Sequence, residues 1–330
     1  MRENPRSYCG DFFDLHHVIQ LMPHFIARAW SSDVGWSFRH APVAIGAAVV
    51  AALLLGMAIF APLIAPHNPF DQSAINLMDA RLPPAWSAEG VQKFLLGTDD
   101  QGRDILSTIM YGARISLTVS VLAVAFSVLV GVSLGLLSGY IGGWFDALVM
   151  RIVDIQLCFP SILVALLISG ILQALLKGSG EMVGANTWVA LGTMVFAIGF
   201  TDWVQYARPV RGSTMIERNK EYVQAARVIG VSSGKIAFTH VLPNVLGPVF
   251  VIATIRFALA IITEATLSFL GVGMPPTLPS LGTLILDGQK VLLSGEWWIA
   301  IFPGLALVLL VLSFNLLGDW LRDALNPKLR

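Results

Sequence analysis

Long apolar stretches separated by polar segments dominate this chain. Six stretches are long enough to cross a bilayer, and they run from Ala41 to Ala65, Ile115 to Ser138, Phe145 to Leu176, Trp188 to Tyr206, Val245 to Leu270 and Trp297 to Leu317. Because a membrane-spanning helix needs about 20 mainly apolar residues, the pattern predicts an all-α polytopic membrane protein with about six transmembrane helices. The third and fifth are expected to be interrupted or tilted, since Pro160 and Pro248 remove helical hydrogen bonds.

The polar stretch from Arg208 to Pro243 separates the fourth and fifth of these segments and predicts a short amphipathic helix. Its small and apolar positions recur with helical spacing at Tyr222, Ala225, Ala226 and Ile229. The polar positions beside them are Glu221, Gln224 and Arg227. Gly230 is typical of a helix end. Two central alanines would form a shallow knob that enters a groove in a partner, and the alternative is a helix lying on lipid headgroups.

Basic residues predict the orientation of the chain. With six spans, both termini and the segment 208–244 share one side, which carries 13 lysines and arginines against six on the other. Basic residues concentrate on the cytoplasmic side, so both termini are expected to be cytoplasmic and the loop 66–114 extracytoplasmic. Residues 1–40 are then a cytoplasmic tail, in which Leu21, Phe25 and Ala29 suggest an interfacial helix, and residues 41–330 form the membrane domain.

Composition agrees with a membrane protein. The chain of 330 residues is 55% hydrophobic and only 13% charged, with a mean hydropathy of +0.73, whereas soluble domains carry about a quarter charged residues. The lipid bilayer is therefore an expected partner. A formal net charge of zero argues against nucleic acid as a partner.

Enzymatic chemistry is not expected in this chain. The run from Gly97 to Asp104 imitates a phosphate-binding loop, but it lacks the lysine and hydroxyl residue that such a loop needs. Cys9 and Cys158 lie far apart and indicate free thiols. No Ser/His/Asp or zinc-binding pattern is present in the sequence, so no catalytic residue, cofactor or metal site is assigned.

Charged residues within or beside the apolar stretches are costly in lipid and need a partner, water or a cavity. They are Arg151, Asp154, Asp202, Arg256 and Glu264. Pairing within the membrane is the preferred interpretation, with Arg151 and Asp154 as neighbours at i and i+3. The functional interpretation places some of them along a translocation pathway. An ion- or proton-driven secondary transporter, with Asp202 or Glu264 titrating, is the alternative function.

The polar stretch also resembles a known signature. Its segments Glu221-Tyr222-Val223, Ala225-Ala226-Arg227, Gly230 and His240-Val241-Leu242-Pro243-Asn244 resemble the EAA-type loop of permease subunits of binding-protein-dependent ABC importers, in the di/oligopeptide and nickel branch. Gln224 replaces the glutamate of the general signature. Further blocks in the same order lie at 96–114, 139–160, 264–273 and 315–327, and they indicate the C-type subunit. The first 40 residues show no such resemblance.

This resemblance implies a role and a set of partners. The loop 208–244 would contain a cytoplasmic coupling helix that docks on an ATPase subunit. The coupling residues would be Glu221, Tyr222, Ala225, Ala226, Arg227, Gly230, Leu242 and Pro243. The complex would comprise a second homologous permease, two cytoplasmic ATPase subunits that bind ATP and Mg²⁺, and an extracytoplasmic solute-binding protein. It would carry peptides, nickel or related small solutes across the inner membrane.

Overall fold

The computed structural model describes residues 33–70, 76–178, 187–275 and 278–325, and most of these are helical. In these ranges extended pairing is limited to an isolated bridge between Thr98 and Asp104. The N-terminal helix α2 spans Asp33–Arg39. The predicted interfacial helix around Leu21, Phe25 and Ala29 lies outside the described residues.

Four helices are long and apolar enough to cross a membrane: α3 (Pro42–Ile59), α5 (Ile105–Ile141), α11 (Leu242–Phe269) with the turns preceding it, and α13 (Trp298–Ala324). A fifth span results if α6 (Gly143–Leu157) and α7 (Ser161–Gly178) count together. The described residues thus hold four or five spans by length and composition, against about six predicted. The remaining predicted span, 188–206, lies in α8 (Thr187–Glu217), which is long but more polar.

The two prolines have different effects. Pro160 separates α6 from α7, which meet at 96°, as the sequence predicted. Pro248 lies inside α11 without ending it. Val245 and Val249, on either side of Pro248, are buried in one cluster with residues of α5 and α8, so packing keeps this helix continuous despite one missing hydrogen bond.

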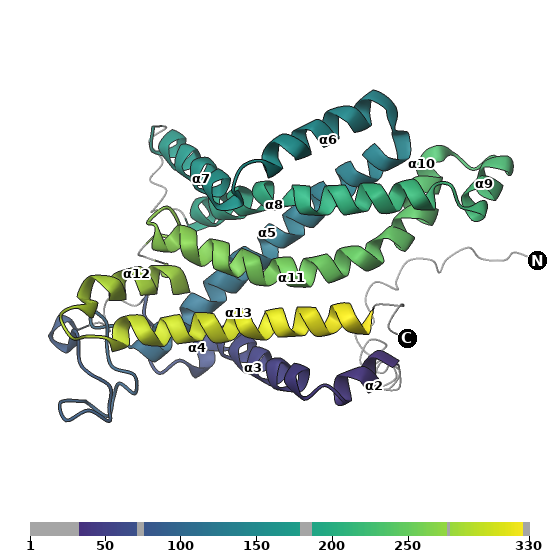
Figure 1. Ribbon diagram of the computed structural model, residues 1–330. Helices are drawn as coiled ribbons and strands as arrows, with labels where there is room; N and C mark the ends of the chain where they lie inside the picture. Colours follow the sequence, from purple (N-terminus) through teal and green to yellow (C-terminus); the bar gives the residue numbers. More distant parts are fainter. Residues whose placement is uncertain (1–32, 71–75, 179–186, 276–277, 326–330) are drawn as a thin grey trace, which may run out of the picture.

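Helices α5 and α8 pack with their backbones in close contact (Figure 1). Gly131, Gly135 and Gly139 repeat every four residues along α5. A Cβ atom at these positions would lie 2.5 Å from the carbonyl oxygens of Trp203 and Ala207 and 2.7 Å from that of Arg211. Small residues at this spacing let membrane helices approach closely, and they make α5–α8 the central pair of the molecule.

The ends of the helical bundle carry different connecting elements (Figure 1). At one end lie α9 (Glu221–Val228) and α10 (Ser233–Lys235), together with α2 and the last turns of α13. At the other end lie α4 (Ala61–Ile64), the loop with the 3-10 turn η1 (Leu77–Asp79), and α12 (Leu281–Leu292). The segments predicted to be cytoplasmic and extracytoplasmic therefore occupy opposite ends.

The helices differ from the predicted pattern in three places. The loop predicted over 66–114 ends at Asp104, because the Asp104 carboxylate caps α5 by accepting from the backbone N–H of Ser107 at 2.9 Å. The loop predicted over 208–244 is largely helical, since α8 continues to Glu217. Helix α12 was not predicted, and its 12 amphipathic residues follow the N-cap Ser280.

Candidate functional site

The candidate site is the connection between α8 and α11, residues 218–244, called here the α8–α11 connection. Its helix α9 begins after Lys220, with Glu221 in the first turn and Arg227 in the last, where each charge favours the helix dipole. Gly230 has φ +86°, and the N–H groups of Gly230 and Val231 donate to the carbonyls of Arg227 and Ala226 at 3.0 Å each. This glycine-based cap ends α9 and turns the chain towards α10.

Helix α9 is held by one face and exposed on the other. Val223 is fully buried and Ala226 is 7% exposed, in a cluster with residues of α5, α8 and α11. Glu221, Gln224 and Ala225 are exposed, and Val228 and Ile229 are 88% and 80% exposed. The sequence prediction placed Tyr222, Ala225, Ala226 and Ile229 on one docking face. Ala225 and Ile229 are exposed, as that prediction requires, whereas Ala226 belongs to the buried stripe centred on Val223 and Ala226. The docking itself stays a prediction.

Tyr222 joins the three elements of the connection. Its hydroxyl donates to Glu217 Oε2 at 2.7 Å and accepts from Asn244 Nδ2 at 3.1 Å. Asn244 Nδ2 also donates to the carbonyl of His240 at 2.8 Å. Hydrogen bonds from Lys220 and then from Tyr222 hold the pKa of the Glu217 carboxyl below its usual range. The last turn of α8, helix α9 and the first turn of α11 are therefore linked through one side chain.

A π-helical turn, η2 (Ile236–Val241), connects α10 to α11. Ile236 and Val241 are buried within the connection, whereas Phe238 is 58% exposed. Leu242 is half-buried, and Pro243 is exposed at the first turn of α11, where proline is tolerated. Single π turns of this kind often lie at functional sites. The sequence carried no signal for this π-helical hydrogen bonding.

Arginines near the connection pair with α5 and α6. Arg211 Nη2 donates to Asp146 Oδ2 at 2.6 Å, and Arg208 pairs with Asp154. Arg218 Nη1 donates to the carbonyl of Gly139 at 2.8 Å. The predicted pair between Arg151 and Asp154 is thus wrong, because α8 brings Arg208 to Asp154.

Three further ionisable side chains lie deeper among the helices. Arg256 Nη1 of α11 lies 3.7 Å from Asp202 Oδ1 of α8, which is the pairing expected of charges inside the bundle. Glu264 is fully buried, and Ser268 Oγ donates to its Oε1 at 2.7 Å. Whether any of these groups line a pathway stays a prediction.

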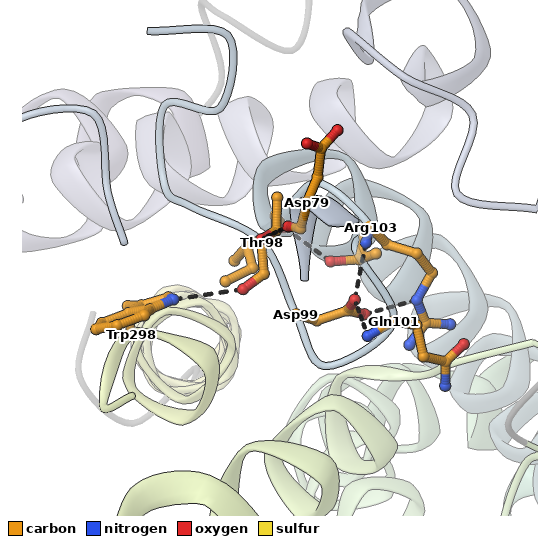
Figure 2. A network of polar contacts seen from close by, with 8 residues as sticks. Asp79, Thr98, Asp99, Gln101, Arg103 and Trp298 are labelled. Atoms are coloured by element: carbon orange, nitrogen blue, oxygen red, sulfur yellow. Dashed lines mark hydrogen bonds and ion pairs between the residues drawn. The ribbon is translucent and has the colours of Figure 1, made fainter. Parts of the chain in front are cut away.

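The loop at the opposite end is a folded unit (Figure 2). Asp99 Oδ2 lies 2.6 Å from Arg103 Nε, with both side chains 4% exposed, and Asp99 Oδ1 accepts from the backbone N–H of Arg103 at 2.8 Å. Trp298 Nε1 donates to the Thr98 carbonyl at 3.3 Å, which ties the loop to α13. A Cβ at Gly97 or Gly102 would lie 2.5 Å from a backbone oxygen. These glycines therefore allow close packing of the backbone. This packing explains why the run from Gly97 to Asp104 resembles a phosphate-binding loop in sequence.

Metal-binding geometry is absent from the part of the chain that the structure describes, where no group of three or more His, Cys, Asp and Glu side chains could hold an ion. The observed interactions around α9 are buried apolar contacts and the hydrogen bonds of Tyr222, which link α8, α9 and α11.

Comparison with known proteins identifies the family. Residues 131–330 match the binding-protein-dependent transport system inner membrane component family, and residues 29–84 match the N-terminal TM domain of oligopeptide transport permease C. The second match begins at residue 29, so it includes part of the N-terminal stretch for which the sequence alone showed no resemblance.

Several relatives cover nearly the whole chain. A di/tripeptide transport system permease protein of Pseudomonas aeruginosa is 39% identical over 316 residues, which is 96% of this chain and 98% of the relative. A dipeptide transport system permease protein of Escherichia coli K12 is 42% identical over 89% and 91% of the two chains. An oligopeptide transport system permease protein of Bacillus subtilis is 38% identical over 90% of each. The chain therefore belongs to the family of binding-protein-dependent transport system inner membrane components, as a C-type permease subunit of the di/oligopeptide and nickel branch.

Proposed function

We propose that this chain is one of two permease subunits of an ABC importer that moves peptides or related small solutes across the cytoplasmic membrane. The substrate class rests on relatives that are dipeptide, di/tripeptide and oligopeptide permeases. The observation that carries the role is α9, a helix anchored on one side by Val223 and Ala226 while Val228 and Ile229 face outward. Two exposed aliphatic residues on an anchored polar helix suit docking into a groove.

Within this proposal, α9 is the coupling helix and divides its residues between two tasks. Glu221, Ala225 and Arg227 are exposed and would contact a cytoplasmic ATPase subunit. Tyr222, Ala226 and Gly230 hold the helix in place from the protein side, as do Leu242 and Pro243 at the start of α11. Two ATPase subunits would bind ATP and Mg²⁺, one beneath this chain and one beneath a second, homologous permease.

Transport would follow alternating access. ATP-driven closure of the ATPase dimer would move α9, and the Tyr222 hydrogen bonds would carry that movement to α8 and α11. The pair between Arg211 and Asp146 would carry it further to α6. A docked partner shifts the equilibrium between inward- and outward-facing states only by its difference in affinity for them, and a rigidly attached helix can supply that difference.

The orientation follows from the same proposal. The α8–α11 connection and both chain ends would face the cytoplasm, and the loop at residues 76–104 would face outward and receive a solute-binding protein. The folded core of this loop, held by Asp99 and Arg103, would give that protein a stable surface. In this proposal the partner subunits bind ATP, and the permease itself catalyses no reaction.

The test is reconstitution in proteoliposomes with the second permease, both ATPases and the binding protein. Uptake of a labelled dipeptide is expected to require ATP and to persist when the proton gradient is collapsed. The matched control is the chain alone, which is expected to move nothing. Uptake by the isolated chain that follows the proton gradient would instead establish the ion-driven secondary transporter.

A further inference from the structure

Glu264 is a carboxyl group buried completely within the membrane part of α11. No ion pair among the described residues includes it. Its Oε1 accepts a hydrogen bond from Ser268 Oγ, one turn later on the same helix, at 2.7 Å. Glu264 belongs neither to the α8–α11 connection nor to the ion pairs of α8. The proposed coupling therefore gives this residue no role.

The surroundings of Glu264 come from three helices. Besides Ser268 of α11, the hydroxyls of Ser116 on α5 and Ser280 at the N-cap of α12 lie near the carboxyl, and all three serines are fully buried. Ser116 Oγ accepts from the backbone N–H of Leu281 at 3.2 Å. Ser280 Oγ accepts from the N–H of Thr283 at 3.4 Å. The cluster thus includes the first turn of α12, whose free N–H groups need acceptors.

The backbones around this cluster leave little space. A Cβ at Gly282 of α12 would lie 2.3 Å from the carbonyl oxygen of Ala265 on α11. A Cβ at Gly112 of α5 would lie 3.3 Å from the carbonyl carbon of Ser280. The first turn of α12 therefore packs directly on α5 and α11. Its position depends on the interactions among Glu264 and the three serines.

An unpaired carboxylate in such a place would be costly, because an ion in an apolar interior loses its hydration without a compensating charge. The Oε2 atom of Glu264 has no hydrogen-bond partner among the described residues. A protonated carboxyl avoids the cost of a buried charge, and its Oε1 still accepts the hydrogen bond from Ser268. The uncharged acid therefore suits this fully buried site, which holds no compensating cation in the described part of the chain, better than the carboxylate does.

We infer that Glu264 is an uncharged positioning residue, whose carboxylic acid joins α5, α11 and α12 through three serines and fixes the first turn of α12 on the membrane helices. Helix α12 in turn leads to Trp298, which holds the folded loop through Thr98. Gly288 of α12 also packs closely on α13, where a Cβ would lie 2.5 Å from the backbone nitrogen of Ala300. Glu264 thus sets the position of the elements at the end of the bundle opposite α9.

The test compares Glu264→Gln with Glu264→Leu in the assembled transporter. Glutamine keeps the length, the neutrality and both hydrogen-bonding functions, whereas leucine keeps only the approximate size. Spin labels at cysteines replacing the exposed Gln289 on α12 and Thr118 on α5 would report the distance between the helices, after Cys9 and Cys158 are replaced by serine. We expect glutamine to preserve a narrow distance distribution and uptake, and leucine to broaden it and lower uptake by about tenfold or more.

Two results would overturn the inference. Loss of uptake in an assembled Glu264→Gln transporter would mean that the carboxyl must ionise, and an unchanged distance distribution in Glu264→Leu would mean that it does not position α12. If Glu264→Leu fails to assemble, Ser116→Ala and Ser280→Ala replace it, with the same broadening expected. The distance measurement needs no substrate, so it stands even if the proposed peptide import fails.

Discussion

Ala225 and Ala226 are neighbours in the chain but lie in opposite environments. Ala226 is buried against the cluster that anchors α9, whereas Ala225 is exposed beside Val228. A large side chain is therefore accommodated at position 225 in the free chain and excluded at position 226. This difference separates the surface offered to a partner from the surface that supports it.

Ala225→Arg is expected to leave the chain folded but to weaken docking of the ATPase subunit. Overfilling a packed contact costs about 1–3 kcal/mol, which corresponds to a loss of about 5- to 150-fold in association. Co-purification of the ATPases and ATP-dependent uptake would measure the effect. Ala225→Ser, which adds only a hydroxyl at the same exposed position, is the matched control. Normal association and uptake in Ala225→Arg would remove the docking assignment.

Tyr222→Phe tests the link between α9 and its neighbours without changing the ring. The variant loses the hydroxyl that contacts Glu217 and Asn244, each hydrogen bond contributing about 1 kcal/mol. We expect the ATPases to remain bound, while more ATP is hydrolysed for each solute imported. The ratio of uptake to phosphate release measures this coupling. An unchanged ratio in Tyr222→Phe, with Ala225→Arg impaired, would confine the role of α9 to docking.

Among the elements, the α5–α8 pair shows how the glycines of one helix determine its packing against another. The glycines of α5 have no side chain that contributes to burial, yet they allow the carbonyls of α8 to approach within van der Waals distance. The bent pair α6–α7 presents a contrast, because Pro160 interrupts it and leaves Phe159 and Leu163 largely exposed. The close packing of α5 and α8 thus depends on small residues, whereas the angle between α6 and α7 depends on the interruption at Pro160.

Gly135→Ala is expected to destabilise the chain, because its Cβ would lie 2.5 Å from the backbone oxygen of Ala207, which cannot rotate away. Overpacking of this kind costs about 1–3 kcal/mol. Gly192→Ala in α8 is the matched control, since no neighbouring atom lies within 4 Å of the added Cβ and alanine favours helices. Thermal unfolding in detergent would compare them. Equal midpoints would contradict the close-contact interpretation of α5 and α8.

At the scale of the whole molecule, the α8–α11 connection and the folded loop lie at opposite ends of the bundle (Figure 1). The distribution of basic residues predicts which end faces the cytoplasm, since arginine and lysine favour that side. The length of the helices separates the two ends, whereas the unequal distribution of lysine and arginine predicts the orientation of the chain in the membrane.

Accessibility of single cysteines tests this topology in a chain whose Cys9 and Cys158 are replaced by serine. A cysteine at the exposed Ser87 is expected to react with a membrane-impermeant reagent from outside, and one at the exposed Ser232 is not. Addition of the liganded binding protein should slow the reaction at Ser87. The reverse pattern of labelling would invert the topology and with it the coupling assignment. Correct topology without slower labelling at any loop position would contradict only the receiving role.

Several features of the fold were accessible from local pattern. Apolar stretches predicted an all-α membrane protein, and Pro160 predicted the break between α6 and α7. The glycine at position 230 predicted the end of α9, because a left-handed residue there follows from local backbone chemistry. The resemblance of Glu221 to Asn244 to the EAA-type loop led to the correct family. These features depend on residues close in sequence, so they need no knowledge of the partners across the bundle.

The sequence by itself determined the membrane class, the family and the place of α9, because hydrophobicity, helix caps and local motifs act over a few turns. Only the tertiary structure decided that Val223 rather than Ala225 is buried, that Asp154 meets Arg208 rather than Arg151, and that Glu264 lies among three serines. Each of these outcomes depends on which helices are neighbours. The spacing of residues along one helix allows more than one of its faces to pack against a neighbour. The choice is made by close packing of distant segments, where the glycines of α5 and α12 set the approach.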